Sequence, residues 1–246
     1  MRSLCFIPAR MGSSRFPGKP LFKINGKPLI QWVYEAAKKA DIDKLYITTP
    51  DDEIIQFCKE KKYPFLKTSN NHERCLDRIY ESYQYMDKKN DNDLIICMQG
   101  DEPLVNYKMI NNIINFHKKK KCDFTVAGLP ITETQFTDPN IVKIAYDDNF
   151  KTIYTSRSPI PHSKNGYKKA IRIFGLFTLN PNGIKMFHEL PPSRLEIIES
   201  CDTNRILGTD LKQYVCILDN IPIQQSVDVL EDAEIASNLL KENLDR

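Results

Sequence analysis

Three cationic side chains lie close together in a segment near the N-terminus that also contains glycines and serines. The segment reads PARMGSSRFPGKPL, directly behind the apolar run LCFIP, and its cations are Arg10, Arg15 and Lys19. Backbone amides of a Gly/Ser-rich turn can converge on an anion while Arg and Lys neutralise the remaining charge, so the segment favours a polyphosphate. It contains neither the GxxxxGK[ST] pattern of a Walker loop nor a GxGxxG fingerprint. A basic surface turn is the alternative interpretation.

A second group of polar residues follows another apolar run. The run DLIICM leads into QGDEP, which contains Gln99, Asp101 and Glu102. If both apolar runs are strands of one parallel sheet, their carboxyl ends open on the same crevice, and a carboxylate there faces the cationic segment. A hard divalent cation would then bridge Asp101 and a bound phosphate. The alternative for Asp101 and Glu102 is an ordinary turn or helix N-cap.

The elements that would position these groups are read from the apolar pattern. In the first half, β-branched or apolar runs at 4–8, 44–49 and 93–99 alternate with amphipathic segments at 29–40, 52–62, 73–86 and 109–120. This alternation predicts right-handed βαβ units, and hence an α/β fold whose mostly parallel, Rossmann-like central sheet is flanked by helices. The crevice then lies beyond the carboxyl ends of the strands.

The second half of the chain has a different pattern. From Asp123 onward, extended segments at 124–130, 142–146 and 171–179 are separated by Pro-rich turns, which predicts a small mixed-sheet lobe over the crevice. Residues 194–207 and 230–244 are expected to be helical, with a strand at 214–218. We find no linker, so residues 1–246 are expected to form one domain with a nucleotide-binding half, 1–122, and an acceptor-binding and dimerisation half, 123–246.

Composition argues against several other classes of protein. The net charge is only +3, and the lysine run at 117–121 fits a solvated helix end better than a nucleic-acid surface. Seven cysteines without a CxxC pair or metal-ligand spacing predict buried, reduced thiols in a reducing compartment. We find no signal-peptide core and no run of about 18 apolar residues. These features predict a cytoplasmic protein without membrane contact.

The motifs resemble a known enzyme family along nearly the whole chain. The opening IPARMGSSRFPGKPLFKINGKPLI resembles that of the bacterial 3-deoxy-manno-octulosonate (KDO) cytidylyltransferases, and QGDEP resembles their QGDEP signature. SVDVLEDAEIA near the end resembles their VDTPEDLE, which aligns Asp228 with a second metal carboxylate; a helix N-cap is the alternative for this residue. HERCLDR, with His72 and Arg78, stands where the family has HxSGTxR, and SRSPIP, with Arg157, matches SRxxIP.

The resemblance implies a fold, a reaction and a site. The fold is that of the nucleotide-diphospho-sugar transferases. The reaction is CTP-dependent transfer of CMP to a small acidic acceptor, KDO or a related keto-deoxy sugar acid, with release of pyrophosphate, for surface polysaccharide biosynthesis. Mg²⁺ is the implied cofactor, with Asp101 and Asp228 as its ligands, and a homodimer is the implied assembly. The implied catalytic residues are Arg10, Arg15, Lys19 and Asp101. The implied nucleotide-binding residues are Pro8, Ala9, Arg10, Gly12, Ser13, Ser14, Arg15, Lys19, Arg78 and Gln99. The implied acceptor-binding residues are Gln99, Arg157, Ile173, Phe177, Glu199 and Asp202.

The acceptor side departs from the KDO pattern. Arg74, Cys75 and Leu76 stand where the family has SGT, and CLDR looks more like the spore-coat polysaccharide-type cytidylyltransferases. Ile173 and Phe177 replace an imidazole and a phenol, and Asp202 with Thr203 replaces a Glu-Gln pair. Because a site that hydrogen-bonds hydroxyls rejects ligands lacking them, these changes predict weak use of KDO and leave another acidic sugar or a phosphonate as alternative acceptors.

Two other classes of function stay open. A catalytically silent nucleotide-binding protein could keep the same fold, although the joint presence of Arg15, Lys19, Asp101 and Asp228 speaks against it. A glycosyltransferase would use a similar sheet but usually carries a DxD metal motif. The DND at 91–93 precedes a strand-like run instead of following one.

Overall fold

A computed structural model describes residues 1–219 and 221–244 of the chain. Its centre is a sheet in the strand order β11-β7-β10-β6-β1-β4-β5. The strands are β1 (Ser3–Pro8), β4 (Lys44–Thr49), β5 (Phe65–Lys67), β6 (Leu94–Met98), β7 (Phe124–Pro130), β10 (Ile171–Leu179) and β11 (Gln213–Ile217). Along this order only β10 runs antiparallel to its neighbours β6 and β7. The predicted α/β fold with a mostly parallel sheet is therefore confirmed.

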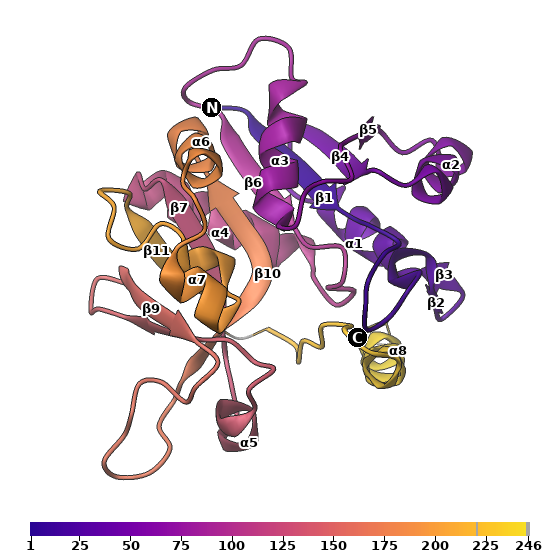
Figure 1. Cartoon of the computed structure of the whole chain (residues 1–246). Coiled ribbons are helices and arrows are strands. Elements are labelled where there is room, and N and C mark those ends of the chain that lie inside the picture. Colours follow the sequence, from indigo (N-terminus) through magenta and orange to yellow (C-terminus); the bar gives the residue numbers. More distant parts are fainter. Residues whose placement is uncertain (220, 245–246) are drawn as a thin grey trace.

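Side-chain alternation along the central strands explains the two helix layers. In β1, Cys5 and Ile7 join the core on one face, whereas Leu4 and Phe6 join the core on the other. The first face is covered by α1 (Leu29–Ala37), α2 (Asp52–Lys61) and α4 (Tyr107–Lys120), and the second by α3 (Cys75–Gln84) and α6 (Pro181–Glu189). Figure 1 looks onto the face that carries α3 and α6.

The extended segments after Asp123 mostly extend the main sheet. Strands β7, β10 and β11 lie inside it or at its edge, so the predicted mixed lobe reduces to the antiparallel pair β8 (Lys143–Tyr146) and β9 (Thr152–Ser156), with α5 (Glu133–Thr137) nearby in the chain. Strand β8 meets β10 at the pair Lys143 and Arg172. The expected helix at 194–207 is interrupted: α7 (Arg194–Glu199) ends at Ser200, whose φ is 50°, and the 3₁₀ turn η2 (Asp202–Asn204) follows.

The C-terminal helix packs on elements from the start of the chain. Helix α8 (Leu230–Leu244) contributes Ala233, Ala236 and Leu240 to a third apolar cluster, which it shares with Ile24 and Leu29. Those two residues belong to the hairpin of β2 (Lys23–Ile24) with β3 (Lys27–Pro28) and to the first turn of α1. Figure 1 shows α8 lying beside this hairpin. The packing returns the segment before α8, with Asp228, to the crevice.

Three further expectations from the sequence can be compared with the structure. All seven cysteines are free thiols, and all except the half-buried Cys75 are buried, as predicted. The lysine run ends α4, whose last turn contains Lys118, Lys119 and Lys120, and Lys121 is the left-handed C-cap. Among the described helices, none has the length and apolar character needed to cross a membrane.

Candidate active site

A cleft of about 940 Å³ opens at the carboxyl ends of β1 and β6. Its walls come from the loop after β1, the loop after β6, the N-terminus of α3, the segments around 140 and 200, strand β10 and the segment 224–229. The predicted site residues that line it are Pro8, Ala9, Arg10, Ser13, Ser14, Arg15, Lys19, Arg78, Gln99, Asp101, Arg157, Ile173, Phe177, Asp202 and Asp228. Gly12 and Glu199 are not part of the lining. The two loops that the sequence singled out therefore face one crevice.

The loop after β1 is closed by its own backbone. The carbonyl of Met11 accepts hydrogen bonds from the amides of Ser13 (3.0 Å) and Gly18 (2.9 Å), and the amide of Met11 donates to the Asp51 carboxylate at 2.7 Å. Gly18 has a φ of 75°, a left-handed conformation that suits glycine, and it leads into the 3₁₀ turn η1 (Lys19–Leu21). This turn fixes where the Lys19 side chain leaves the backbone.

Lys19 lies between the two predicted metal carboxylates. Its Nζ is 2.9 Å from Asp101 Oδ2 and 3.5 Å from Asp228 Oδ1, and Arg15 Nη2 is 2.9 Å from the same Asp228 oxygen. Burial acts to lower the pKa of Lys19, but the two carboxylates outweigh burial, so the pKa is raised and the ammonium stays charged. Four side chains from three distant parts of the chain thus form one charge cluster at the mouth of the cleft.

The Asp101 carboxylate is only half satisfied by the protein. Its Oδ1 is buried and has no hydrogen-bond partner among the described residues. Next to it, the buried Glu102 accepts hydrogen bonds from Ser226 Oγ (2.7 Å) and the Gly175 amide (3.2 Å), and burial raises the pKa of Glu102 to about 7. A Cβ at Gly175 would come within 2.9 Å of Glu102 Oε1, so glycine is what allows this close approach.

Hydrogen bonds around Glu102 and Asp101 also hold the C-terminal segment. The amide of Val227 donates to the Asp101 carbonyl at 2.9 Å, and the amide of Asp228 donates to Asp232 at 2.9 Å. Together with the bond from Ser226 to Glu102, these contacts set the separation of the Asp101 and Asp228 carboxylates. No third His, Cys, Asp or Glu joins them in a metal-binding group within 1–219 and 221–244.

Arg78 lies deeper in the cleft wall than the loop cations. It is buried, and its Nη1 donates to Thr68 Oγ1 and to the carbonyl of Ser69. Burial lowers the pKa of this guanidinium, and the nearby positive charge of Arg10 lowers it further. Arg10 itself is exposed. The pair concentrates positive charge on the side of the cleft that the sequence assigns to the nucleotide.

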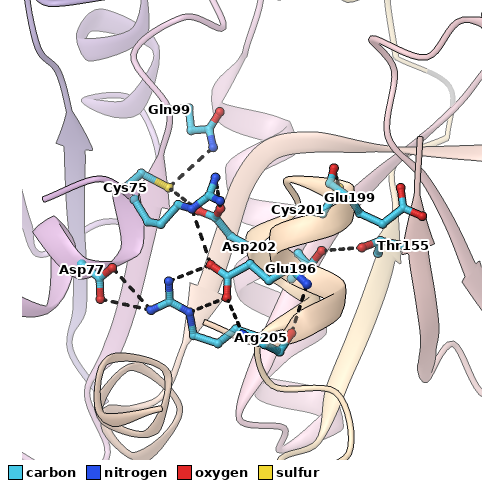
Figure 2. A network of polar contacts seen from close by, with 12 residues as sticks. Cys75, Asp77, Gln99, Thr155, Glu196, Glu199, Cys201, Asp202 and Arg205 are labelled. Atoms are coloured by element: carbon cyan, nitrogen blue, oxygen red, sulfur yellow. Dashed lines mark hydrogen bonds and ion pairs between the residues drawn. The ribbon is translucent and has the colours of Figure 1, made fainter. Parts of the chain in front are cut away.

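A buried ion network supports the opposite wall. Arg205 forms a two-pronged contact with Glu196, at 2.8 and 2.7 Å. Figure 2 shows these two side chains facing each other. Arg74 lies 3.2 Å from Asp202 and 3.5 Å from Glu196. The Cys75 thiol donates to Asp202 at 3.7 Å. Burial raises the pKa of Asp202, and Arg74 opposes that rise. The network joins α3, α7 and η2, so it positions the Arg74 and Asp202 side chains that line the cleft.

Arg157 is held by backbone carbonyls. Its side chain donates to the carbonyls of Glu199 (2.9 Å), Pro139 (3.1 Å) and Asn140 (3.3 Å). The fully buried Lys143 donates to the carbonyls of Asp138 (2.9 Å), Ile141 (2.7 Å) and Arg157. These two cations fix the loop 138–141 against β9.

Glu199 and Gly12 lie outside the cleft lining. The Glu199 carboxylate accepts hydrogen bonds from Tyr154 Oη (2.6 Å), Ser156 Oγ (2.7 Å) and the amide of Arg157 (2.9 Å). These contacts orient Arg157, and direct acceptor binding by Glu199 stays a prediction. Gly12 is exposed in the loop after β1.

Four residues that help to build the site received no role from the sequence motifs. Arg172, Gln224 and Ser226 line the cleft, and Lys143 lies behind its wall. Arg172 and Lys143 sit within strand-like runs, where a cation signals a paired or functional charge. The lone signal for Gln224 and Ser226 was their place just before Asp228.

The mostly parallel sheet presents a cationic Gly/Ser loop to two carboxylates across a cleft lined by Arg and Lys. This arrangement is the framework of a nucleotidyltransferase. The chain belongs to the cytidylyltransferase family, whose profile it matches over residues 4–226.

Two relatives and two solved structures resemble the chain over nearly its full length. It is 36% identical to the 3-deoxy-manno-octulosonate cytidylyltransferase of Thermodesulfovibrio yellowstonii, covering 98% of both chains. It is also 36% identical to the 8-amino-3,8-dideoxy-manno-octulosonate cytidylyltransferase of Shewanella woodyi, covering 96% of this chain and 97% of the relative. A structure of CMP:2-keto-3-deoxy-manno-octonic acid synthetase complexed with CTP superposes with a TM-score of 0.90 at 26% identity, covering 99% of this chain and all (100%) of the other. UDP-glucose pyrophosphorylase shares the fold, with a TM-score of 0.72 at 16% identity and coverage of 99% and 100%.

Proposed function

We propose that the protein transfers CMP from CTP to the hemiketal hydroxyl of a keto-deoxy sugar acid, either KDO or a close derivative such as its 8-amino form, and releases pyrophosphate. Family membership supports the nucleotide chemistry. The names of the two relatives at 36% identity support this class of acceptor, and because their identities are equal they do not choose between the two acids. The product would be a CMP-sugar for surface polysaccharide biosynthesis.

The observation that carries the proposal is the charge cluster of Lys19, Asp101 and Asp228. The Lys19 ammonium lies 2.9 Å from the Asp101 carboxylate and 3.5 Å from the Asp228 carboxylate, next to the loop that contains Arg10 and Arg15. Cationic and anionic side chains therefore meet at one point of the cleft. In nucleotidyl transfer the protein mainly positions the reactants and stabilises charge that develops at phosphorus. A cluster of this kind serves both tasks without a covalent nucleophile.

The donor set fits Mg²⁺. Asp101 Oδ1 is buried without a partner in the described part of the chain, and Asp228 is partly exposed beside it. Mg²⁺ is commonly bound by one or two carboxylates and completes its shell with phosphate oxygens and water, so a third protein ligand is not required. Asp101 and Asp228 would hold the ion, which when bound supplies positive charge at the α-phosphate.

The side chains of the cleft have separable tasks in this scheme. Arg10, Arg15 and Lys19 neutralise the triphosphate, and the loop amides with Ser13 and Ser14 bind its oxygens. Arg78 fixes the segment at Thr68 and Ser69 through its hydrogen bonds and adds positive charge. The wall of Arg74, Asp202 and Arg157 faces the acceptor, together with Ile173 and Phe177.

Pyrophosphate release tests the proposal. The assay varies the nucleotide (CTP against ATP, GTP and UTP), Mg²⁺ against a chelator, and a panel of acceptors: KDO, 8-amino-KDO, another acidic sugar and a phosphonate. We expect release only with CTP, Mg²⁺ and a keto-deoxy sugar acid, at a kcat/KM of about 10⁴ M⁻¹s⁻¹ or more for the preferred acid.

Other outcomes of the assay would replace the proposal. If a derivative is the preferred acid, the polar groups lost at Ile173 and Phe177 predict that KDO is used about 100-fold less well than that derivative. Turnover of the phosphonate alone would move the acceptor to another class. CTP binding without turnover of any acceptor would favour a silent nucleotide-binding protein. The homodimer and the cytoplasmic location stay predictions, to be tested by light scattering and cell fractionation.

A further inference from the structure

Arg172 is a cation inside the cleft wall that has no matching anion in the described part of the chain. It lies on β10 and lines the cleft, yet no carboxylate of the described residues comes within ion-pair distance of its guanidinium. Its hydrogen bonds are long: both the one to the carbonyl of Ile173 and the one to the carbonyl of Gln224 measure 3.4 Å. Most of its five N–H donors are therefore available to a ligand.

Glu102 does not take the place of that anion. Its charge acts on Arg172, where it opposes the lowering of the pKa by burial. The Oε1 atom of Glu102 is engaged by Ser226 Oγ at 2.7 Å and by the Gly175 amide at 3.2 Å. Glu102 thus holds the segment that carries Gln224 next to Arg172, and the Arg172 guanidinium is left facing the cleft.

Gln224 adds a second unsatisfied group at the same place. Its side chain is only 7% exposed and lines the cleft. Its Nε2 donates to the Pro222 carbonyl at 2.9 Å, whereas its Oε1 is buried and has no partner among the described residues. A buried acceptor without a donor is unfavourable, so this oxygen suits the hydroxyl of a bound molecule.

We propose that Arg172 and Gln224 form a subsite for the acceptor, in which the Arg172 guanidinium binds the acceptor carboxylate and Gln224 Oε1 accepts a hydrogen bond from one of its hydroxyls. An unpaired guanidinium beside an unpaired acceptor oxygen is complementary to a hydroxy acid. Arginine suits the first role because its planar fork matches a carboxylate in a two-pronged contact. This subsite rests on the proposed function and assigns a recognition role to two residues that had received none from the sequence.

The location of the subsite agrees with the chemistry of the acceptor. In a 2-keto sugar acid the hemiketal hydroxyl that attacks phosphorus is on the carbon next to the carboxylate. Arg172 interacts with Glu102, which is adjacent in sequence to Asp101, and Gln224 is four residues before Asp228. A carboxylate held on Arg172 would therefore keep the attacking oxygen near the two-carboxylate site.

The experiment compares Arg172→Met and Gln224→Met with the wild type, using each accepted sugar acid and its methyl ester. The ester removes the charge of the carboxylate, so the wild type should prefer the acid. In Arg172→Met the preference for the acid over the ester should fall by about 10-fold to 100-fold, because the guanidinium that binds the acceptor carboxylate is absent. The KM for CTP should stay within about twofold in both variants. Arg194→Met and Gln56→Met, at exposed positions away from the cleft lining, are matched controls.

Gln224 is tested with monodeoxy analogues of the acceptor. Gln224→Met should raise the KM of the intact acid by about 10-fold, and should leave unchanged the KM of the one analogue that lacks the hydroxyl bound by Oε1. Unequal losses of this kind cannot come from a general loosening of the fold. Melting temperatures of both variants serve as the check on folding.

The outcomes separate the subsite from the reaction. If the wild type transfers CMP to a keto-deoxy sugar acid but Arg172→Met keeps the wild-type acid-to-ester ratio, the subsite is wrong and the reaction stands. A Gln224→Met variant whose KM rises equally for the acid and every deoxy analogue would also overturn the subsite. Wild-type inactivity with all such acids would instead remove the proposed function.

Discussion

The contact between Arg205 and Glu196 gives the sharpest test of how the acceptor wall is held. Glu196 is fully buried (0% exposed) and Arg205 nearly so (4%), and two short hydrogen bonds of 2.8 and 2.7 Å join them. Arg205→Met removes both bonds and leaves Glu196 with the longer contact to Arg74 at 3.5 Å and the Ser193 amide at 3.3 Å. The Glu196 carboxylate then stays buried with little compensation.

The size of the loss follows from the burial. Removing one partner of a buried ion pair typically costs about 3–5 kcal/mol, and two charge-assisted hydrogen bonds at about 1.5–3 kcal/mol each give a similar sum. For a domain of this length, each kcal/mol shifts the melting temperature by about 2–4 °C. We therefore expect Arg205→Met to melt about 6–20 °C below the wild type.

A double-mutant cycle identifies the cause of that loss. Glu196→Gln keeps the shape of the side chain and its contact with the Ser193 amide but removes the charge. The variant Arg205→Met/Glu196→Gln should therefore recover at least about 1 kcal/mol relative to Arg205→Met alone, measured by urea denaturation. If the double variant is less stable than Arg205→Met by the full cost of Glu196→Gln, the two effects are additive and the reasoning about an uncompensated buried charge is refuted.

The other predictions concern the paired carboxylates, a buried histidine and a buried lysine. Asp101→Asn and Asp228→Asn should each lower kcat at least about 100-fold with an unchanged circular dichroism spectrum; wild-type turnover across an Mg²⁺ titration would exclude that residue from the metal site. Burial lowers the pKa of His117 to about 4 from 6.5, so between these values the unfolded chain binds more protons and stability should fall by up to about 3 kcal/mol as the pH drops from 7 to 4. Urea midpoints of His117→Gln should depend less on pH than those of the wild type, and parallel curves would contradict this. Lys143→Met should raise the KM of the acceptor at least about 10-fold while leaving that of CTP unchanged, because the loop 138–141 loses its buried anchor; an equal rise in both constants would assign Lys143 to general stability.

The parts of the fold that follow from local patterns were predictable. Continuous apolar runs at 4–8 and 94–98 identify strands buried on both faces, and the amphipathic segments between them identify the helices. The insertion of β10 between β6 and β7 could not be predicted from the sequence, because strand order depends on long-range pairing that does not affect local periodicity. For the same reason the predicted lobe was too large. The break in the helix after Glu199 depends on one left-handed residue, Ser200, that carries no turn signature.

The candidate site also contains some residues that could be predicted from the sequence and others that could not. Arg15, Lys19 and Asp101 lie in loops whose composition already suggested phosphate and metal chemistry, and the structure brings them together. Among the described residues, Arg172 has no ion-pair partner and Gln224 Oε1 has no hydrogen-bond donor, and only the folded structure shows that these groups are left open. Such an absence is a property of the folded surroundings, which no residue pattern encodes.

Strand β10 is made late in synthesis, yet it pairs with a strand made much earlier: Leu176 lies opposite Met98 of β6. Until the ribosome has released β10, the nascent β6 is paired only with β1, and its free edge exposes backbone N–H and C=O groups between apolar side chains. Strand β7 likewise lacks its neighbouring strands until β10 and β11 have been synthesised. Pairings of such long sequence separation form slowly, so the growing chain passes through a stage in which it is prone to aggregate. We expect chaperones to bind the chain at this stage. A chain ending at residue 122 would keep this open edge permanently, and we expect it to be insoluble.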